Sequence, residues 1–445
     1  MKQKKSLWWL SGIALVLVAA MILGSLLPKA QAEGLIAAPE YPKMVPYPNN
    51  AINSNDNQAE YNRWNTCIRQ QYDQPDGYAD GLDSFFTRSI PLFLAEEDEN
   101  TVCSPLNIYM ALAMLAETTG GNSRDQVLSL LQIEDLDALR TQAGHVWNAH
   151  YRADGASASL LANSLWLDNG YDFDPATVSR LAENYYASVY QGDLGSTAMN
   201  SAIQTWLNEQ TRGLLEDAVS DIQVPEGTAL TLASTVYFQA RWLHLFQASN
   251  NTEGLFHSPG GDISCTFMNQ TQTYGPYYYG QDYGAVRLNL DQSGSMWLIL
   301  PDEGLGVRDI LESGHALNAI LTEEGGTHSQ TKVHLSLPKF DISANYDLKD
   351  SLTALGLGNL FDPGRADFSS ILPNTAPVWL DQVSHAARVA IDEEGVTAAA
   401  YTMMNYYTAP VPPEEEVYFT LDRPFLFVIT SSDGLPLFTG IVNTP

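Results

Sequence analysis

The spacing of apolar residues separates a helix-rich first half of the chain from a strand-rich second half. Apolar side chains recur at helical spacing in four stretches, and each stretch predicts an amphipathic helix. These stretches are residues 82–97, 104–121, 175–190 and 201–215. Two largely apolar, β-rich runs, residues 158–167 and 230–242, have the length and composition of strands.

Strand-like runs dominate from Phe256 to the C-terminus. They are residues 285–290, 296–301, 332–343, 387–392, 416–421, 424–430 and 435–442. One helix, predicted at residues 346–357, interrupts them. Because neither a repeat nor a linker divides residues 81–445, the pattern predicts one α+β domain over that range.

The N-terminal residues have the layout of an export signal. A basic start, MKQKK, precedes a long apolar run that ends with Ala30 and Ala32, the small residues of a cleavage site. Residues 1–32 are therefore predicted to be a signal peptide of a secreted, extracellular protein. The run is also long enough to act as an uncleaved membrane anchor.

Residues 33–80 are rich in Pro, Asn and Gln and predict a spacer that buries little surface, with a short helix at 61–71.

The charge of the chain limits which partners it can bind, and its cysteines indicate whether it has disulfides. The chain has 22 Lys and Arg against 52 Asp and Glu, a net charge of −30, and four of the lysines lie in residues 1–32. Nucleic acid, anionic membrane and heparin are therefore not expected as partners. The three cysteines, Cys67, Cys103 and Cys265, are odd in number and widely spaced, so no disulfide framework is expected. Export without disulfides is typical of a bacterial protein.

The sequence lacks the local motifs of the common enzyme classes. It contains no G-x-S-x-G, H-E-x-x-H, Walker or G-x-G-x-x-G motif, and its eight histidines form no cluster with ligand spacing. Neither a metal nor a cofactor is therefore expected. A secreted hydrolase with a carboxylate pair stays an alternative because such a pair needs no local motif.

Several segments, taken in order, resemble the serpin family. They are NTVCSPLNI (100–108), QTWLNEQTRG (204–213), VYFQARWLHLF (236–246), LPDEG (300–304), LSLPKFDI (335–342), FDPGRADFSSI (361–371), RPFLFVI (423–429) and LPLFTGIVN (435–443). The resemblance covers residues 81–445. It implies a fold of three β-sheets and about nine helices, with an exposed reactive-centre loop near the C-terminus that serves as protease bait. It also implies a monomer, no catalysis of its own, and loop-sheet polymers as the failure mode.

The residues from Gly395 to Ala409 carry neither charge nor proline, although acidic clusters flank them. A strand that enters the middle of a sheet needs a donor at every residue and a buried face, and this composition meets both demands. The resemblance implies that the start of this stretch, together with the two glutamates before it, is the hinge of an inserting loop. The hinge residues are Glu393, Glu394, Gly395, Val396, Thr397, Ala398, Ala399 and Ala400. The same residues suit a helix or a plain surface loop, and a non-inhibitory serpin acting as a substrate or binding protein is the alternative function.

Pro410 affects where the loop is cut. The register of the family places the scissile bond between Ala409 and Pro410, but serine proteases rarely cleave before proline. We therefore predict cleavage between Thr408 and Ala409, with the bond after Tyr407 as second choice. Thr408 suits elastase-like and subtilisin-like serine proteases, whereas Tyr407 or Tyr406 suits a chymotrypsin-like one.

The resemblance also identifies a polar cluster that controls opening of the main sheet. Its members are Ser104, Asn107, Ser234 and His385, and Trp242 lies where the loop enters. Asn107 and Ser234 occupy positions where the family usually has Ser and Asn, respectively. Because the exchange keeps the same donors and acceptors, we predict a hydrogen-bond network with exchanged partners, in which these two residues lie close together. Ordinary core packing is the alternative role for His385 and Trp242.

Overall fold

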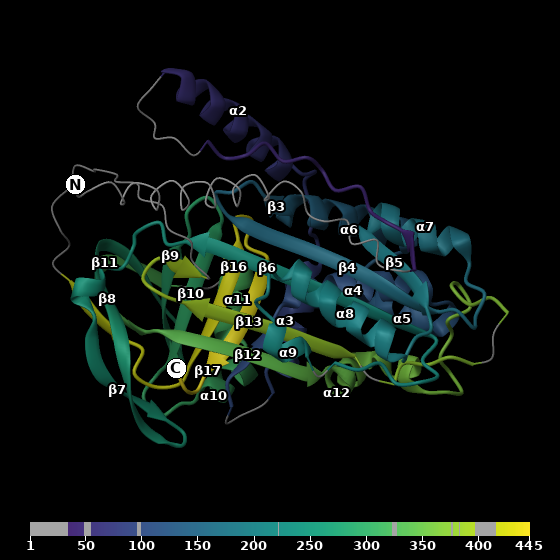
Figure 1. The fold of residues 1–445 in the computed structure, drawn as a ribbon. Helices are drawn as coiled ribbons and strands as arrows, with labels where there is room; N and C mark the ends of the chain where they lie inside the picture. The colour runs from purple at the N-terminus through teal and green to yellow at the C-terminus, as the bar shows by residue number, and fades with distance from the viewer. Residues whose placement is uncertain are drawn as a thin grey trace, which may run out of the picture.

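The computed structural model describes residues 34–48, 55–95, 99–220, 222–322, 327–374, 377–381, 383–396 and 415–445 (Figure 1). The hydrogen-bonded strands of these residues form two large sheets. Within the same residues, no helix is long and apolar enough to cross a membrane.

The first sheet has eight strands, and its path begins at the N-terminal end of the described chain. Its order is β1 (Leu35–Ala37), β5 (Ala187–Gly192), β4 (Ala158–Asp168), β6 (Leu230–Arg241), β14 (Gly395–Val396), β13 (Ser384–Ile391) and β12 (Phe340–Asp347), with β3 (Arg152–Ala153) paired to β4. The β4 and β5 strands are parallel, and the other pairs are antiparallel. The central strands thus come from widely separated parts of the chain.

The second sheet has nine strands. Its order is β15 (Glu416–Thr420), β11 (Thr327–Pro338), β8 (Gly261–Tyr279), β9 (Tyr283–Asn289), β10 (Gly294–Pro301), β16 (Phe425–Ser431), β17 (Pro436–Val442) and β2 (Thr101–Cys103), with β7 (Thr252–Ser258) paired to β8. The 19-residue strand β8 pairs with β7 over residues 261–267, with β11 over residues 267–279 and with β9 over residues 277–279. Continuous pairing through β8 therefore joins the second and third sheets that the resemblance implies.

Helices cover the sheets and fill the space between them. Their bounds are α2 (Asn55–Tyr72), α3 (Leu82–Phe93), α4 (Pro105–Thr118), α5 (Gly121–Leu131), α6 (Leu136–His150), α7 (Pro175–Asn184), α8 (Thr197–Gln210), α9 (Glu216–Val219), α10 (Val307–Ser313), α11 (His315–Leu321) and α12 (Lys349–Leu352). Helix α4 contacts β6 of the first sheet and β17 of the second. It begins at Ser104, whose hydroxyl accepts from the Asn107 N–H, and Pro105 fits the first helical position.

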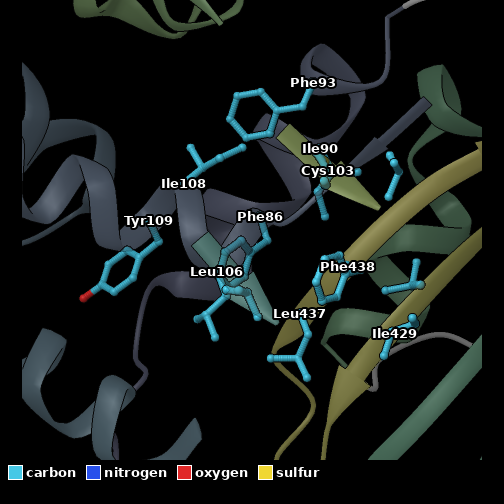
Figure 2. Packing of buried hydrophobic residues seen from close by; sticks show 14 of the residues in the cluster. Phe86, Ile90, Phe93, Cys103, Leu106, Ile108, Tyr109, Ile429, Leu437 and Phe438 are labelled. Carbon is cyan, nitrogen blue, oxygen red and sulfur yellow. The ribbon is translucent and has the colours of Figure 1, made fainter. Parts of the chain in front are cut away.

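Successive side chains of a strand point to opposite faces of the sheet, so they pack in two different hydrophobic cores. Along β4, Leu161 and Leu165 point into the large core with α4, whereas Ala162 and Trp166 pack in a smaller cluster with α8. Figure 2 shows the large core around Phe86, Leu106 and Phe438. The first sheet is therefore covered on both faces, by α4 on one and by α8 on the other.

Two of the predicted helices differ from the structure in their bounds. The helix predicted at 175–190 ends at Asn184, because Tyr186 has a φ of 52° and the chain then continues as β5. The helix predicted at 346–357 begins only at Lys349 and is regular to Leu352; a short π-helical segment, Thr353–Leu357, follows it and is kinked at Gly356, which has a φ of 98°. Pairing with neighbouring strands overrides the helical pattern at Ala187–Gly192 and at the end of β12.

Residues 33–80 bury few side chains in the part that is described, but those few dock the segment on the fold. The side chain of Trp64 in α2 is buried, with 1% of the residue exposed, and its indole N–H donates to Asp154 Oδ2 at 2.8 Å. Tyr41 stacks on Trp147 and Tyr151. Figure 1 shows α2 along the upper side of the molecule, and the predicted helix at 61–71 lies within it. A few aromatic residues therefore dock this segment although its average composition is polar.

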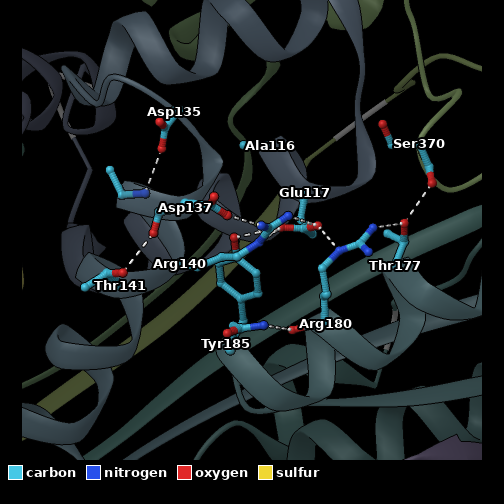
Figure 3. A network of polar contacts seen from close by, with 12 residues as sticks. Ala116, Glu117, Asp135, Asp137, Arg140, Thr141, Thr177, Arg180, Tyr185 and Ser370 are labelled. Atoms are coloured by element: carbon cyan, nitrogen blue, oxygen red, sulfur yellow. Dashed lines mark hydrogen bonds and ion pairs between the residues drawn. The ribbon is translucent and has the colours of Figure 1, made fainter.

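A buried carboxylate joins three helices next to the large core. Glu117 of α4 accepts from Arg140 of α6 at 2.8 Å and from Arg180 of α7 at 2.6 Å (Figure 3). Burial alone would raise the pKa of Glu117, but the two guanidinium groups hold it below its ordinary value. The carboxylate therefore stays charged and fixes α4 against α6 and α7.

Candidate functional site

The first sheet is open between β6 and β13. In the described residues these strands do not pair with each other, and β14 lies between them at one end through Gly395 and Val396. A cavity of about 690 Å³ lies at the far part of the gap, beside residues 230–235 of β6 and His385 and Ala386 of β13. It is lined by Ile108 and Ala111 of α4 and by Ile203 and Leu207 of α8, which cover opposite faces of the sheet. The cavity therefore passes through the sheet, as expected where a strand is missing.

The hinge begins inside this sheet. Val396 pairs with Ile391 of β13 on one side and with Ala240 of β6 on the other. A Cβ on Gly395 would lie 2.2 Å from the Ala240 carbonyl oxygen, so the backbone approaches β6 too closely for any other residue. The predicted hinge residues Gly395 and Val396 therefore already form the first two residues of a central strand.

Trp242 lies at the point where the hinge enters the sheet, as predicted. Its indole N–H donates to the Asp392 carbonyl at 2.8 Å, and its backbone N–H donates to the Glu394 carbonyl at 3.0 Å. The residue is 3% exposed and packs edge-on against Phe246. It is thus both part of the core and a direct hydrogen-bond partner of the hinge.

Glu393 has charged and polar partners that the sequence did not reveal. Lys339, between β11 and β12, forms an ion pair of 2.6 Å with the Glu393 carboxylate, and Asn251 donates to the same oxygen at 2.6 Å. Burial would raise the pKa of Glu393, but these two partners lower it. Lys339 lies in the segment LSLPKFDI, which suggested the family but gave no sign of this pairing.

Three of the four predicted members of the polar cluster, Asn107, Ser234 and His385, line the cavity. Asn107 Nδ2 donates to the Ser234 carbonyl at 2.9 Å, and the Ser234 hydroxyl donates to Asn107 Oδ1. The predicted contact between these two residues is therefore present. The Ser234 hydroxyl also lies 2.6 Å from Asn163 Oδ1, and Asn163 Nδ2 donates to the Tyr185 carbonyl at 2.8 Å. Asn163 on β4 is a further member of the cluster that sequence reasoning missed.

His385 joins the same cluster from β13. Its Nε2 accepts from the Ser104 backbone N–H at 3.1 Å, which requires an unprotonated Nε2. Burial lowers the pKa of His385 to about 4. The neutral ring therefore ties β13 to the start of α4. The role of Ser104, Asn107, Ser234 and His385 in controlling sheet opening stays a prediction.

The predicted cleavage site lies outside the described residues. This applies to Thr397, Ala398, Ala399 and Ala400 of the hinge and to Tyr406, Tyr407, Thr408 and Ala409 of the bait segment. The described chain resumes at Glu415, directly before β15. No group of three or more His, Cys, Asp or Glu side chains that would hold a metal occurs in the part of the chain that is described.

Comparisons with known proteins agree with this architecture. The family model for serpins (serine protease inhibitors) matches residues 84–445. An uncharacterized serpin-like protein of Thermococcus kodakarensis is 30% identical over 369 residues, which is 81% of this chain and 84% of that protein. Human leukocyte elastase inhibitor is 30% identical over 388 residues, covering 82% of this chain and 99% of that protein.

A solved structure shares the fold. The thermophilic serpin tengpin in its native state matches with a TM-score of 0.74 and 22% identity, over 84% of this chain and 95% of that chain. The α+β architecture predicted for residues 81–445 is thus confirmed at the level of the fold.

Proposed function

The chain belongs to the serpin family, whose members are generally protease inhibitors rather than enzymes, and we propose that it is a suicide-substrate inhibitor of extracellular serine proteases. In the proposed mechanism a protease cuts the segment that follows Val396 and forms an acyl-enzyme. The cut segment then enters the main sheet as a new strand and carries the protease with it, which distorts the protease active site before the ester is hydrolysed.

The gap between β6 and β13 is the observation that carries this proposal. The hinge residues Gly395 and Val396 already lie between the two strands, and a strand continued from them would reach the cavity beside Ser234 and His385. Since β14 is antiparallel to both neighbours, the residues that follow Val396 would extend it along the cavity. Their lack of charge and proline suits a strand buried at that place.

The energy of strand insertion is large enough for such a mechanism. A dozen inserted residues bring two dozen backbone groups into ladder bonds at ~0.5–1.5 kcal/mol each, or on the order of 10–30 kcal/mol before the entropy cost. The whole stability of a typical domain is about 5–15 kcal/mol. Insertion can therefore deform a bound protease.

The target class follows from the bait segment and the N-terminus. Thr408 before Ala409 fits the small pockets of elastase-like and subtilisin-like proteases, with a chymotrypsin-like enzyme as second choice through Tyr407 or Tyr406. The apolar run after MKQKK supports export, so the targets would be met outside the cell.

Incubation of the chain without residues 1–32 with elastase, subtilisin and chymotrypsin tests the proposal. We expect a complex that survives SDS, together with a released C-terminal fragment that begins at Ala409 or Thr408. An Ala398→Arg variant provides the control, because alternation puts residue 398 on the same face of an inserted strand as the buried Val396, and a charge buried there should turn the inhibitor into a substrate. Cleavage of the unaltered chain without any stable complex would instead indicate a non-inhibitory serpin.

A further inference from the structure

His150, the last residue of α6, is a buried histidine outside the open sheet and its polar cluster. Only 5% of the residue is exposed. Its ring lies between its own helix and the turn that joins β16 to β17. Nδ1 is 2.6 Å from the Val146 carbonyl oxygen, and Nε2 is 3.0 Å from Asp433 Oδ1. Both ring nitrogens therefore face oxygen atoms that accept hydrogen bonds.

This arrangement of acceptors requires a protonated ring. A carbonyl oxygen can only accept, so Nδ1 must carry a proton, and the ionised Asp433 carboxylate requires a second proton on Nε2. A ring with both protons is a positively charged imidazolium. Burial would lower the pKa of His150, but the charge and the hydrogen bond of Asp433 raise it above the ordinary 6.5. In turn, burial would raise the pKa of Asp433, but the charge of His150 holds it well below its ordinary value.

Asp433 joins the ring to two other parts of the chain. The Tyr78 hydroxyl, from the turn that precedes α3, donates to Asp433 Oδ2. The Ser431 hydroxyl at the end of β16 donates to Asp433 Oδ1 and lies 3.1 Å from His150 Nε2. We call His150, Asp433, Ser431 and Tyr78 the His150 latch. It connects the end of α6, the turn between β16 and β17, and the turn before α3.

Ser431 gives the neutral ring an alternative partner. If Nε2 lost its proton, its lone pair would face Asp433 Oδ1 and the ion pair would be lost. The Ser431 hydroxyl can then turn away from Asp433 and donate to Nε2. Tyr78 stays a donor throughout, because burial and the charge of Asp433 raise its pKa. The latch therefore has two hydrogen-bond patterns, and the proton on His150 selects between them.

We propose that the His150 latch is a pH-operated device that fixes the turn between β16 and β17 while His150 is protonated and loosens this turn in alkaline surroundings. Solvent reaches the pair from the turn, since 33% of the Asp433 side chain is exposed against 2% of the His150 side chain. The change is local. The strands on either side of the turn stay paired in the core, from Phe425 with Val442 to Ile429 with Phe438.

The direction of the pH dependence follows from the two states of the turn. In the loosened state His150 meets water and titrates near 6.5, whereas in the closed state its pKa is higher. The closed state therefore has its full stability below pH 6.5 and loses it as the pH rises through the closed-state pKa. Between these two values the closed state should weaken about tenfold for each pH unit.

An NMR titration of the histidine rings tests the protonation of the latch. The His150 signal, identified by its absence in His150→Gln, should titrate above pH 6.5. In Asp433→Asn the carboxylate charge is gone while the burial remains, so the same signal should titrate below pH 6.5. Asp262→Asn is the matched control, because it removes the carboxylate of the exposed His257–Asp262 pair and should leave the His150 signal unchanged.

Amide hydrogen exchange measures whether the turn itself responds. The Gly434 N–H donates to the Ser431 carbonyl, and the Ser431 N–H donates to the Leu435 carbonyl. The protection factors of these two amides should fall several-fold from about pH 6.5 to about pH 8.5 in the unaltered and Asp262→Asn chains. In Asp433→Asn they should stay level, because the ion pair that the rising pH breaks is absent.

Two results would overturn the inference. One is a His150 signal that titrates at or below pH 6.5 in the unaltered chain, which would show that the ring is neutral and the latch is not charged. The other is the same exchange profile in Asp433→Asn and Asp262→Asn, which would show that the turn does not follow the proton on His150. Neither measurement involves a protease, so the outcome is independent of the proposed function.

Discussion

Single polar side chains hold the open sheet together at its centre. The Ser234 hydroxyl on β6 contacts Asn107 of α4 and Asn163 of β4, and His385 of β13 accepts from the start of α4. Each contact joins a different pair of elements. Removing one partner leaves a buried donor or acceptor unsatisfied, which costs more than the bond itself contributes.

Ser234→Ala should therefore destabilise the protein by about 1–3 kcal/mol, because it leaves Asn107 Oδ1 and Asn163 Oδ1 without their shared donor. The free energy of unfolding in urea measures the effect. Ser295→Ala, which removes an exposed hydroxyl bonded to Asn289, is the control and should change the stability little. Equal stabilities of the two variants would show that the Ser234 hydroxyl does not support the sheet.

His385 should make stability depend on pH. Its pKa is lowered to about 4 in the folded chain by burial, against 6.5 for an ordinary histidine. Between these values the unfolded chain binds a proton that the folded chain does not, so this contribution is present above pH 6.5 and is lost as the pH falls to 4. From pH 7 to 5 the loss should be about 2 kcal/mol.

Urea unfolding of His385→Gln at the two pH values checks this expectation. The variant cannot titrate at this position, so its stability should fall less between pH 7 and 5 than that of the unaltered chain. The same fall in both proteins would show that the buried ring does not contribute to the pH dependence.

Sequence reasoning found the residues of the cluster that lie in recognisable motifs and missed the others. Ser104 and Asn107 lie in the motif NTVCSPLNI at the start of a helix. Ser234 lies in the strand that continues into the motif VYFQARWLHLF. Asn163 and Lys339 were missed because each contacts a residue far away in the chain: Asn163 contacts Ser234, and Lys339 contacts Glu393. A single sequence does not report such pairs.

At the scale of elements, the hinge is held by contacts that insertion need not break. The Asp392 carboxylate accepts from the Glu394 and Gly395 N–H groups, and Trp242 donates to the backbone on both sides of Glu393. The Lys339 ion pair then anchors Glu393 itself. The turn therefore stays fixed while the chain beyond Val396 changes place.

Glu393→Lys should loosen this turn. The change places two positive charges together and removes the acceptor of Asn251, so strands of other copies should enter the gap more easily. We expect loop-sheet polymers to form several-fold faster on heating, as measured by size-exclusion chromatography. The exchange Lys339→Glu with Glu393→Lys should restore part of the resistance.

The control for this variant is Glu312→Lys, which reverses one charge of the exposed Arg308–Glu312 pair far from the hinge in sequence. Its rate of polymer formation should equal that of the unaltered chain. Equal rates for Glu393→Lys and Glu312→Lys would contradict the anchoring role of Glu393.

The apolar pattern predicted elements well where a helix or strand is bounded by its own sequence. The helix at 104–121 is such a case, because Ser104, Pro105 and the Gly120–Gly121 pair mark its ends. The boundary at 184–187 was not predicted because residues 187–190 keep a helical pattern but pair with β4. Tertiary pairing decided the structure there.

At the scale of the whole molecule, the N-terminal segment is part of the folded body. Strand β1 pairs with β5 at the edge of the open sheet, and α2 is fixed through Trp64 and the buried Arg152–Asp154 ion pair. The composition of residues 33–80 concealed this because the polar average of the segment hides its few docking aromatic residues.

Trp64→Ala should lower the free energy of unfolding by about 3–5 kcal/mol, since it empties a buried site and leaves Asp154 with one donor fewer. Urea unfolding measures the change. Tyr72→Ala at the end of the same helix is the control, because Tyr72 is 38% exposed and should matter less. An unchanged stability of Trp64→Ala would show that the segment is not docked in solution.

The central claim is that the cut segment fills the gap between β6 and β13, and hydrogen exchange of β6 tests it most directly. In the intact chain, β6 pairs with β4 along residues 230–239 and faces the gap with its other edge. After cleavage of the bait segment we expect the alternate β6 amides that face the gap to become strongly protected, because an inserted strand accepts from them. Unchanged exchange of these amides in the cleaved chain would contradict insertion.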